Sequence, residues 1–255
     1  MRVMHHLLTT LPSLLLAFGA CVFTTPSVQA SVNEAPGGIF RYQLRAFGAL
    51  AGEARLTIDT PTLGQGDGLH RVRIEAETAG AAARIFDAQG EGTSLVNARF
   101  LPMRMKWQAT LRARLRKAEA TMGAKGLEGS YQYGKKTPRR FKHTTAQWPL
   151  DAVSAYLWLP RQDLKPGARY VRPFFDGKWM GQLEAKVGKV SSIQVPVGLR
   201  EVVPIKISAG RKGKARRVTF WVGVDDRILY RIDVAHSVLG RVSAELVALR
   251  RPTPG

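Results

Sequence analysis

The sequence predicts an all-β protein, a single antiparallel β-roll or open barrel-like domain with one short central helix. Apolar and polar residues alternate with a period of two along most of the chain, which is the pattern of strands with one buried and one solvated face. Turn-forming residues separate these runs at short intervals. A convincing helical pattern occurs once, and many short strands with almost no helix are typical of an antiparallel sheet.

The N-terminal half begins with strand-like runs at residues 40–45, 54–59 and 71–76, the last two typical of a hairpin around a Gly-rich loop at 61–68. The clearest alternation follows at residues 103–116. It predicts one long strand of about 40 Å, since a strand rises by roughly 3.3 Å per residue. Its apolar face begins with Met103, Met105 and Trp107, and its solvated face carries Arg104, Lys106, Arg112, Arg114 and Arg116.

The C-terminal half starts with the predicted helix, at residues 152–159. Residues 123–147 before it are polar and basic, and predict a strand, a turn and an irregular connection. Asp151 is the expected N-cap and Pro160 the expected stop. Two helical turns need tertiary packing to persist. The remaining runs predict strands at 170–175, 179–187, 193–197, 202–207, 218–224, 228–234 and 241–249, with turns at 176–178 and 225–227.

The domain organisation follows from these runs. Residues 31–249 are expected to form one domain, because a chain of about 225 residues is long enough to bury a sufficient hydrophobic core. The segment 143–150 is a candidate division between two half-sheets. Residues 250–255 are expected to be a disordered tail.

Residues 1–30 have the layout of a signal peptide, with a positive charge at Arg2, an apolar run and small residues at Val28 and Ala30. Cleavage after Ala30 would place the protein in the periplasm. The strongest apolar block, residues 14–23, is shorter than the roughly 20 residues of a membrane span. The alternative is a lipoprotein anchored at Cys21, because residues 18–21 resemble a lipobox with Phe in place of the usual Leu.

Cysteine and histidine usage limits the chemistry. Cys21 is the only cysteine, so cleavage after Ala30 would exclude disulfides, thiol catalysis and cysteine metal sites. The histidines after the leader, His70, His143 and His236, are not at metal-ligand spacing. Ser154 is not in a Gly-x-Ser-x-Gly elbow, and residues 225–226 are typical of a turn. We therefore expect no catalytic residue, no metal site and no cofactor.

The chain is strongly basic, with a formal net charge of +20. Residues 99–142 contain thirteen Lys and Arg against two Glu, and a second basic cluster occupies residues 211–217. Inside a cell this would indicate nucleic acid, but an exported protein meets lipopolysaccharide, phospholipid headgroups, acidic polysaccharides or envelope proteins instead. A generally basic surface is the alternative explanation. The candidate anion-binding residues are Arg104, Lys106, Arg112, Arg114, Arg116, Lys135, Lys136, Arg139 and Arg140.

Nine short motifs follow one another along the chain, at residues 51–56, 76–80, 85–90, 100–102, 151–156, 164–167, 175–178, 220–227 and 239–242. In this order they resemble the DUF3108 family of exported bacterial proteins, a domain of unknown function. The resemblance covers roughly residues 38–249 and implies a β-rich, roll-like or barrel-like periplasmic domain. It implies no activity and no catalytic residues, and the strongly basic segment 104–142 departs from it.

Two non-enzymatic functions are consistent with the sequence. The first is a binding or envelope-assembly accessory protein whose basic face engages an anionic glycan, a lipid headgroup or an acidic partner. The second is a carrier that encloses an apolar ligand in a β-roll cavity, with Met103, Met105 and Trp107 as part of its wall. A hydrolase with an unrecognised site is a distant third, since the sequence contains no converging titratable groups.

Overall fold

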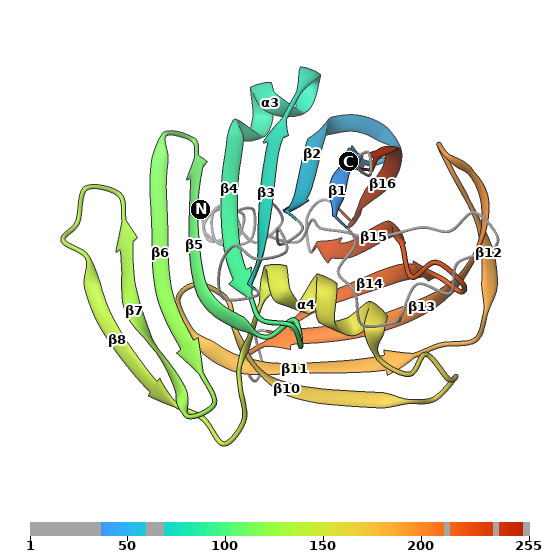
Figure 1. Cartoon of the computed structure of the whole chain (residues 1–255). Coiled ribbons are helices and arrows are strands. Elements are labelled where there is room, and N and C mark those ends of the chain that lie inside the picture. The colour runs from blue at the N-terminus through green and yellow to red at the C-terminus, as the bar shows by residue number, and fades with distance from the viewer. Residues whose placement is uncertain (1–36, 60–68, 212–214, 237–239, 252–255) are drawn as a thin grey trace.

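The computed structural model describes residues 37–59, 69–211, 215–236 and 240–251. The expected signal peptide with Ala30 and Cys21, the loop at 61–68 and residues 252–255 of the expected tail lie outside these ranges. Within them the predicted all-β class is confirmed, because almost every element is a strand of one open, curved sheet (Figure 1).

The first half of the sheet is a meander in which each strand pairs antiparallel with the next. Alternating apolar residues give each strand a buried face, and short turns join the neighbours. Its strands are β1 (Gly38–Ala46), β2 (Ala49–Asp59), β3 (His70–Thr78), β4 (Ala88–Val96), β5 (Pro102–Leu111), β6 (Arg114–Gly123), β7 (Gly126–Tyr133) and β8 (Arg139–Thr144).

The second half continues the same sheet, because the last strand pairs with the first: Tyr42 of β1 lies opposite Leu246 of β16. The order runs β8 to β1, then β16 to β13, β11, β10 and β9, with β12 paired to β13. These strands are β9 (Leu150–Asp151), β10 (Arg169–Phe175), β11 (Met180–Val187), β12 (Ser191–Val195), β13 (Gly198–Gly210), β14 (Arg216–Gly223), β15 (Leu229–His236) and β16 (Gly240–Arg250).

The two ends of this sheet lie close together at one point. Residues 145–149 connect β8, at one end of the strand order, to β9 at the other. A five-residue connection spans at most about 18 Å, so the sheet curls until its ends approach. The indole Nε1 of Trp148 donates to the carbonyl of Pro102 at 2.7 Å and ties the connection to β5. The segment expected to divide two half-sheets therefore bridges the two ends of one sheet.

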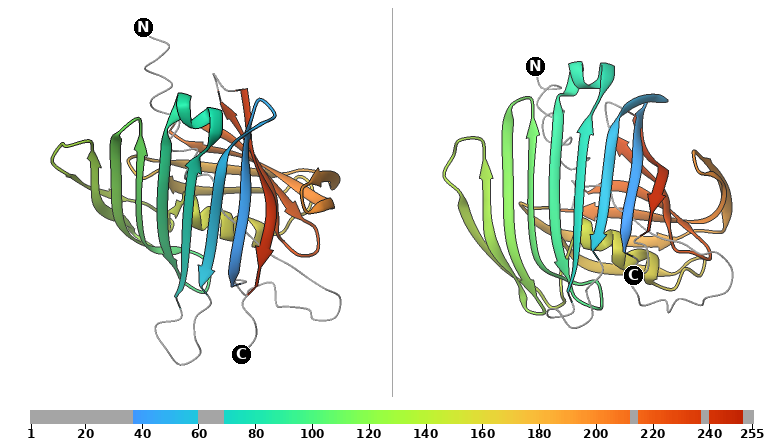
Figure 2. Two further views of the ribbon diagram at one scale, coloured as in Figure 1. Left: turned by 90° about the horizontal axis from the view of Figure 1, so that it is seen from above. Right: turned by 45° about the horizontal axis from the view of Figure 1, so that its top comes forward.

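Helix α4 (Ala152–Trp158) lies inside the curve of the sheet (Figure 2). All of its residues from Val153 to Trp158 are buried, which is why an apolar sequence of only seven residues is stable as a helix. Asp151 caps it as predicted, and a 3₁₀ turn (Leu159–Arg161) containing Pro160 ends it.

The predicted long strand at residues 103–116 is wrong, because the structure has a hairpin there. Arg112 and Ala113 form a two-residue turn with φ values of 47° and 60°, and β6 begins at Arg114. Positive φ at both central residues is the geometry of a type I′ turn, whose twist suits two paired strands. The turn reverses the chain and shifts its phase, so Arg114 and Arg116 of β6 lie on the opposite face of the sheet from Arg104 and Lys106 of β5.

This turn supports a test of its backbone strain. Ala113 has a φ of 60°, where an L-residue is strained and glycine is not. We expect Ala113→Gly to raise the free energy of unfolding by about 0.5–1 kcal/mol, measured by urea denaturation. Gly134, in the β7–β8 turn, has the same φ and open space around its Cα, so Gly134→Ala should have the opposite effect. A destabilised Ala113→Gly variant would contradict the assigned turn.

Four further features differ from the sequence prediction. The irregular connection expected before residue 147 contains strand β8, and Arg250, expected in the tail, is paired with Ile39 in the sheet. The alternating pattern also missed β4 and a second short helix, α3 (Gly80–Phe86), which has no side-chain N-cap.

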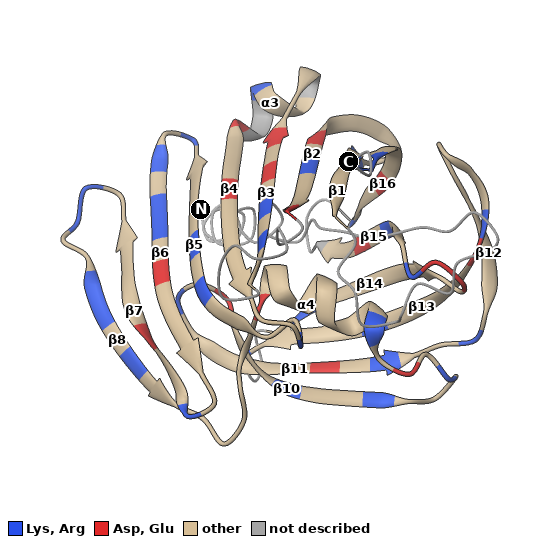
Figure 3. Ribbon diagram, in the orientation of Figure 1, with Lys and Arg blue, Asp and Glu red and all other residues tan. Residues whose placement is uncertain are grey.

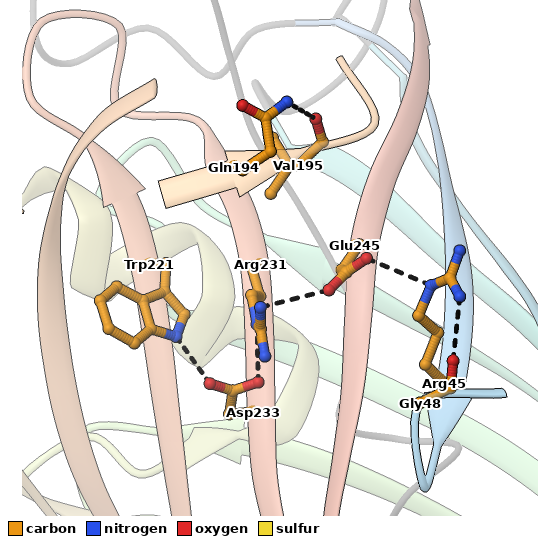
Figure 4. A network of polar contacts seen from close by, with 8 residues as sticks. All are labelled: Arg45, Gly48, Gln194, Val195, Trp221, Arg231, Asp233 and Glu245. Atoms are coloured by element: carbon orange, nitrogen blue, oxygen red, sulfur yellow. Dashed lines mark hydrogen bonds and ion pairs between the residues drawn. The ribbon is translucent and has the colours of Figure 1, made fainter. Parts of the chain in front are cut away.

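A polar network crosses the convex face of the second half (Figure 4). Arg231 donates to Asp233 at 2.8 Å and pairs with Glu245 at 3.2 Å, and Glu245 also pairs with Arg45 of β1 at 3.3 Å. Trp221 donates to Asp233 at 2.9 Å. The side chains of Asp233 and Glu245 are only 9% and 13% exposed, so these contacts are shielded from solvent and link β14, β15, β16 and β1.

Candidate anion-binding site

Strands β5–β8 and their turns form an extended part of the sheet, here called the basic wing, which contains all nine predicted anion-binding residues (Figure 3). The structure distributes them over three places. Arg104, Lys106 and Arg140 are on the convex face, and Arg112, Lys135 and Lys136 are in turns. Arg114, Arg116 and Arg139 are on the concave face, because they pair with Leu111, Ala109 and Tyr131 in the register of the sheet.

The convex face of the basic wing is partly neutralised. Lys106 pairs with Glu119 at 3.1 Å and Lys142 pairs with Glu128 at 3.3 Å. Both pairs are well exposed, so each contributes little to stability. This face offers alternating charges of both signs rather than a uniform positive surface.

On the concave face, cations lie against tyrosine rings. Arg116 and Tyr133 are cross-strand partners, and the guanidinium carbon of Arg116 is 5.0 Å from the centre of the Tyr133 ring. Arg114 donates to the Tyr133 hydroxyl at 3.5 Å. This hydrogen bond from Arg114, followed by the nearby charges, lowers the pKa of Tyr133. Tyr133 thus contacts two guanidinium groups, one through its ring and one through its hydroxyl.

The turn between β10 and β11 reaches this same face from the other half of the sheet. The ammonium of Lys178 is 5.1 Å from the ring centre of Tyr131, and 4.9 Å from that of Trp179. Trp179 is 42% exposed, and Arg211 lies over its ring at 4.3 Å. Sequence reasoning assigned Lys178 and Trp179 to a hairpin but gave no sign that they meet the basic wing.

The start of β14 adds Arg216, which lies opposite Ala209 of β13. Its side chain is half-buried, and this desolvation lowers the pKa of Arg216, with Asp176 acting in the opposite direction and Arg116 in the same direction. Arg216 belongs to the second basic cluster found in the sequence, at residues 211–217. The structure therefore brings parts of the two basic clusters together around Asp176.

The predicted apolar ligand wall is a packed part of the core. Met105 and Trp107 are buried with Phe175 and Ala118 in a cluster inside the basic wing, and Met103 is half-buried at the start of β5. Gly177 lies directly against the indole of Trp107. The wall is thus covered by the end of β10 and the turn that follows it.

The remaining acid groups do not extend this site. Glu53, Glu75, Glu77 and Glu91 gather on the convex face of β2–β4, beside the basic wing, where Glu91 accepts from Gln108 of β5 (Figure 3). Asp226 is in the turn expected from the sequence, and its carboxylate accepts from the amide of Ile228 and from the Tyr230 hydroxyl. Within the described ranges, no group of three or more His, Cys, Asp or Glu is arranged to hold a metal ion.

The comparison with protein families agrees with the motifs of the sequence. The family model described as "Protein of unknown function (DUF3108)" matches residues 41–247. The chain belongs to the DUF3108 family. This membership confirms the predicted resemblance and brings no activity with it, because the family has no assigned function.

Solved structures similar to this DUF3108 protein support the fold. A β-barrel-like protein of the DUF1849 family from Brucella abortus has a TM-score of 0.59 at 12% identity, over 86% of this chain and 99% of its own. A Bacteroides fragilis protein described as exported, with a YmcC-like fold, has a TM-score of 0.38 at 9% identity, over 91% and 100%. The first similarity shows the barrel-like fold, and the second is too distant to support an argument.

Two further findings concern this DUF3108 protein. No curated protein matches its sequence. Among the residues that the structure describes, neither helix is long and apolar enough to cross a membrane.

Proposed function

We propose that this DUF3108 protein is a periplasmic, non-enzymatic binding or envelope-assembly accessory protein that engages an anionic envelope component through its basic wing. The observation that carries this proposal is the position of the cations. They lie at one end of the sheet, in exposed turns and on the outermost strand, and the carboxylates of β2–β4 lie elsewhere. A charge distribution of this kind attracts and orients an anionic partner.

Export supports the envelope as the place of action. Residues 1–30 have the charged, apolar and small-residue regions of a signal peptide, with Ala30 at the cleavage position. Anchoring at Cys21, the alternative, would hold the same basic wing near a membrane surface. In either case the available polyanions are lipopolysaccharide, phospholipid headgroups, acidic polysaccharides and acidic envelope proteins.

The β7–β8 hairpin provides a direct test of this function. Lys135, Lys136, Arg139 and Arg140 are all exposed. We expect their combined replacement by Glu to reduce cosedimentation with lipopolysaccharide or phosphatidylglycerol vesicles at least about tenfold, because each cation near an anionic surface contributes about 1 kcal/mol. Added salt should weaken binding of the wild-type protein by screening the same charges.

A matched control distinguishes the effect of charge in this hairpin from the effect of the net charge of the protein. Arg169, Lys186 and Lys206 are cross-strand neighbours on β10, β11 and β13, and with Lys189 they form an exposed group of four cations outside the basic wing. Replacing these four by Glu changes the net charge by the same amount. Binding should then stay close to that of the wild-type protein, and an equal loss in both variants would contradict a role for the basic wing.

A further inference from the structure

We propose that the concave side of the basic wing contains a defined phosphoryl-binding site, centred on Arg116 and Arg216. Three segments far apart in the sequence converge there. Strands β6 and β7 contribute Arg114, Arg116 and the two tyrosines, the β10–β11 turn contributes Lys178, and β14 contributes Arg216. The inference rests on the proposed function and specifies where on the basic wing the anion is held.

Positive charge is concentrated in this place. Asp176 is the acid group close enough to affect both Tyr131 and Arg216. Its Oδ1 already accepts from the backbone amides of Lys178 at 2.9 Å and Trp179 at 2.7 Å. Among the described residues, no ion pair joins Arg114 or Arg216 to a carboxylate. A bound anion would offset this repulsion between like charges.

Partial burial and like charge both act on Arg216. Its side chain is half-buried, and desolvation, followed by the charge of Arg116, lowers the pKa of its guanidinium, so the folded state disfavours the charged form of Arg216 unless an anion is near. Groups with perturbed pKa values cluster at functional sites, where an anionic partner can offset concentrated positive charge. The convex face of the same strands shows the contrast, because Lys106 there has Glu119 as a direct partner.

The geometry favours a phosphoryl group as the ligand. Arginine has planar, forked donors that fit the oxygens of phosphate, and a phosphoryl group carries up to three acceptor oxygens and nearly two negative charges. Three guanidinium groups and the Lys178 ammonium carry more positive charge than one phosphoryl group neutralises and more donors than its three oxygens need. Tyr133 and Tyr131 hold Arg116 and Lys178 by cation–π contacts, so less side-chain entropy is lost on binding.

The neighbouring core indicates which part of a ligand enters. The apolar cluster beside this site is filled by Phe175 and Gly177, which cover Trp107. An acyl chain would have to displace them, whereas a phosphorylated headgroup or sugar needs only the polar surface. The phosphoryl group can come from a free phosphorylated saccharide or from the headgroup of a lipid-linked one.

Calorimetric titration of the full mature chain with deacylated, phosphorylated lipopolysaccharide oligosaccharide tests this site. Arg116→Gln and Arg216→Gln should each weaken binding at least about tenfold. Lys117→Gln is the matched control, because Lys117 is exposed on the opposite face of β6 and its loss should change affinity by less than about twofold. Intact lipopolysaccharide binding more tightly than the oligosaccharide would identify the lipid-linked source.

Other outcomes would overturn the inference. Equal affinities of Arg116→Gln and Lys117→Gln for the oligosaccharide would refute the phosphoryl-binding site. The proposed function would still be supported if the β7–β8 charge reversal abolished cosedimentation with lipopolysaccharide or vesicles. Tighter binding of polygalacturonate than of the phosphorylated oligosaccharide would refute the phosphoryl assignment. If the arginine variants fail to fold, Lys178→Ala in the exposed turn should still weaken binding by several-fold, and unchanged affinity would refute the site.

Discussion

Replacing Gly177 by Ala should destabilise the protein by about 3 kcal/mol. Gly177 has a φ of 89°, where a side chain is strained, and a methyl group there would overlap the indole of Trp107. The backbone strain costs about 1–2 kcal/mol, and overpacking typically costs a further 1–3 kcal/mol. The turn after β10 would move away from β5 or the indole would rotate out of the core. Urea denaturation measures the loss, and tryptophan fluorescence reports the movement.

Gly167 provides the control for this prediction. It has a φ of 90° and no atom within 4 Å of the position that a Cβ would occupy. Gly167→Ala therefore introduces the backbone strain alone and should cost about 1–2 kcal/mol. Equal destabilisation by both substitutions would mean that Gly177 does not pack against Trp107. Because Lys178 and Trp179 follow Gly177, its substitution should also weaken phosphoryl binding.

Asp151→Ala should have an effect of similar size. The Asp151 carboxylate accepts from the Ser154 amide at 2.7 Å and from the Ser94 hydroxyl at 2.8 Å, and all three residues are buried. The substitution removes the helix cap and leaves a buried amide and hydroxyl without this acceptor. Loss of a cap costs about 1 kcal/mol and each unsatisfied group about 1–3 kcal/mol, so we expect about 3 kcal/mol in total.

Asp151→Asn separates the hydrogen bonds from the charge. An amide oxygen can still accept from Ser154, so this variant should lose less stability than Asp151→Ala. Burial raises the pKa of Asp151 above its usual value, and the Ser154 and Ser94 hydrogen bonds oppose part of the rise. The folded state therefore binds this proton more tightly than the unfolded state does.

The raised pKa of Asp151 predicts how the stability of the protein changes with pH. The stabilisation that Asp151 gains from its proton is complete below the unfolded pKa, near 3.8, and is lost as the pH rises through the folded value. The stability of the wild-type protein relative to Asp151→Asn should fall over that interval and then become constant. Urea midpoints measured from pH 3 upward would show it, and a relative stability that rises with pH would contradict the assignment.

The sequence predicted the class of the fold and the central helix because both depend on local pattern. Asp151, the apolar run and Pro160 lie together in the chain, and their roles follow from helix capping and termination. The hairpin at Arg112 was missed because apolar residues at 111, 113 and 115 continue the alternation across the turn. The change of phase at Ala118, Ala120 and Met122, which are buried, was the signal that the chain had reversed.

The candidate site was predictable only in part. The basic character of residues 104–142 is a matter of composition, but its division between two faces depends on the register of β5 with β6. The contributions of Lys178 and Arg216 depend on how far the whole sheet curls. No local sequence pattern encodes the curvature of the whole sheet, since this curvature is set by the sum of the strand twists and by packing around α4.

The pairing of β1 with β16 has a consequence for how the chain reaches this structure. Ile39 and Arg250 are partners in the register although they lie at opposite ends of the described chain. Such a contact cannot form until the last residues are available, and proteins dominated by distant pairings fold slowly. Each half can form its own meander early, whereas the seam between them closes late. As long as the β1–β16 pairing is open, Phe40 and Leu246 are uncovered. We expect a chain in that state to be the form most exposed to aggregation and proteolysis.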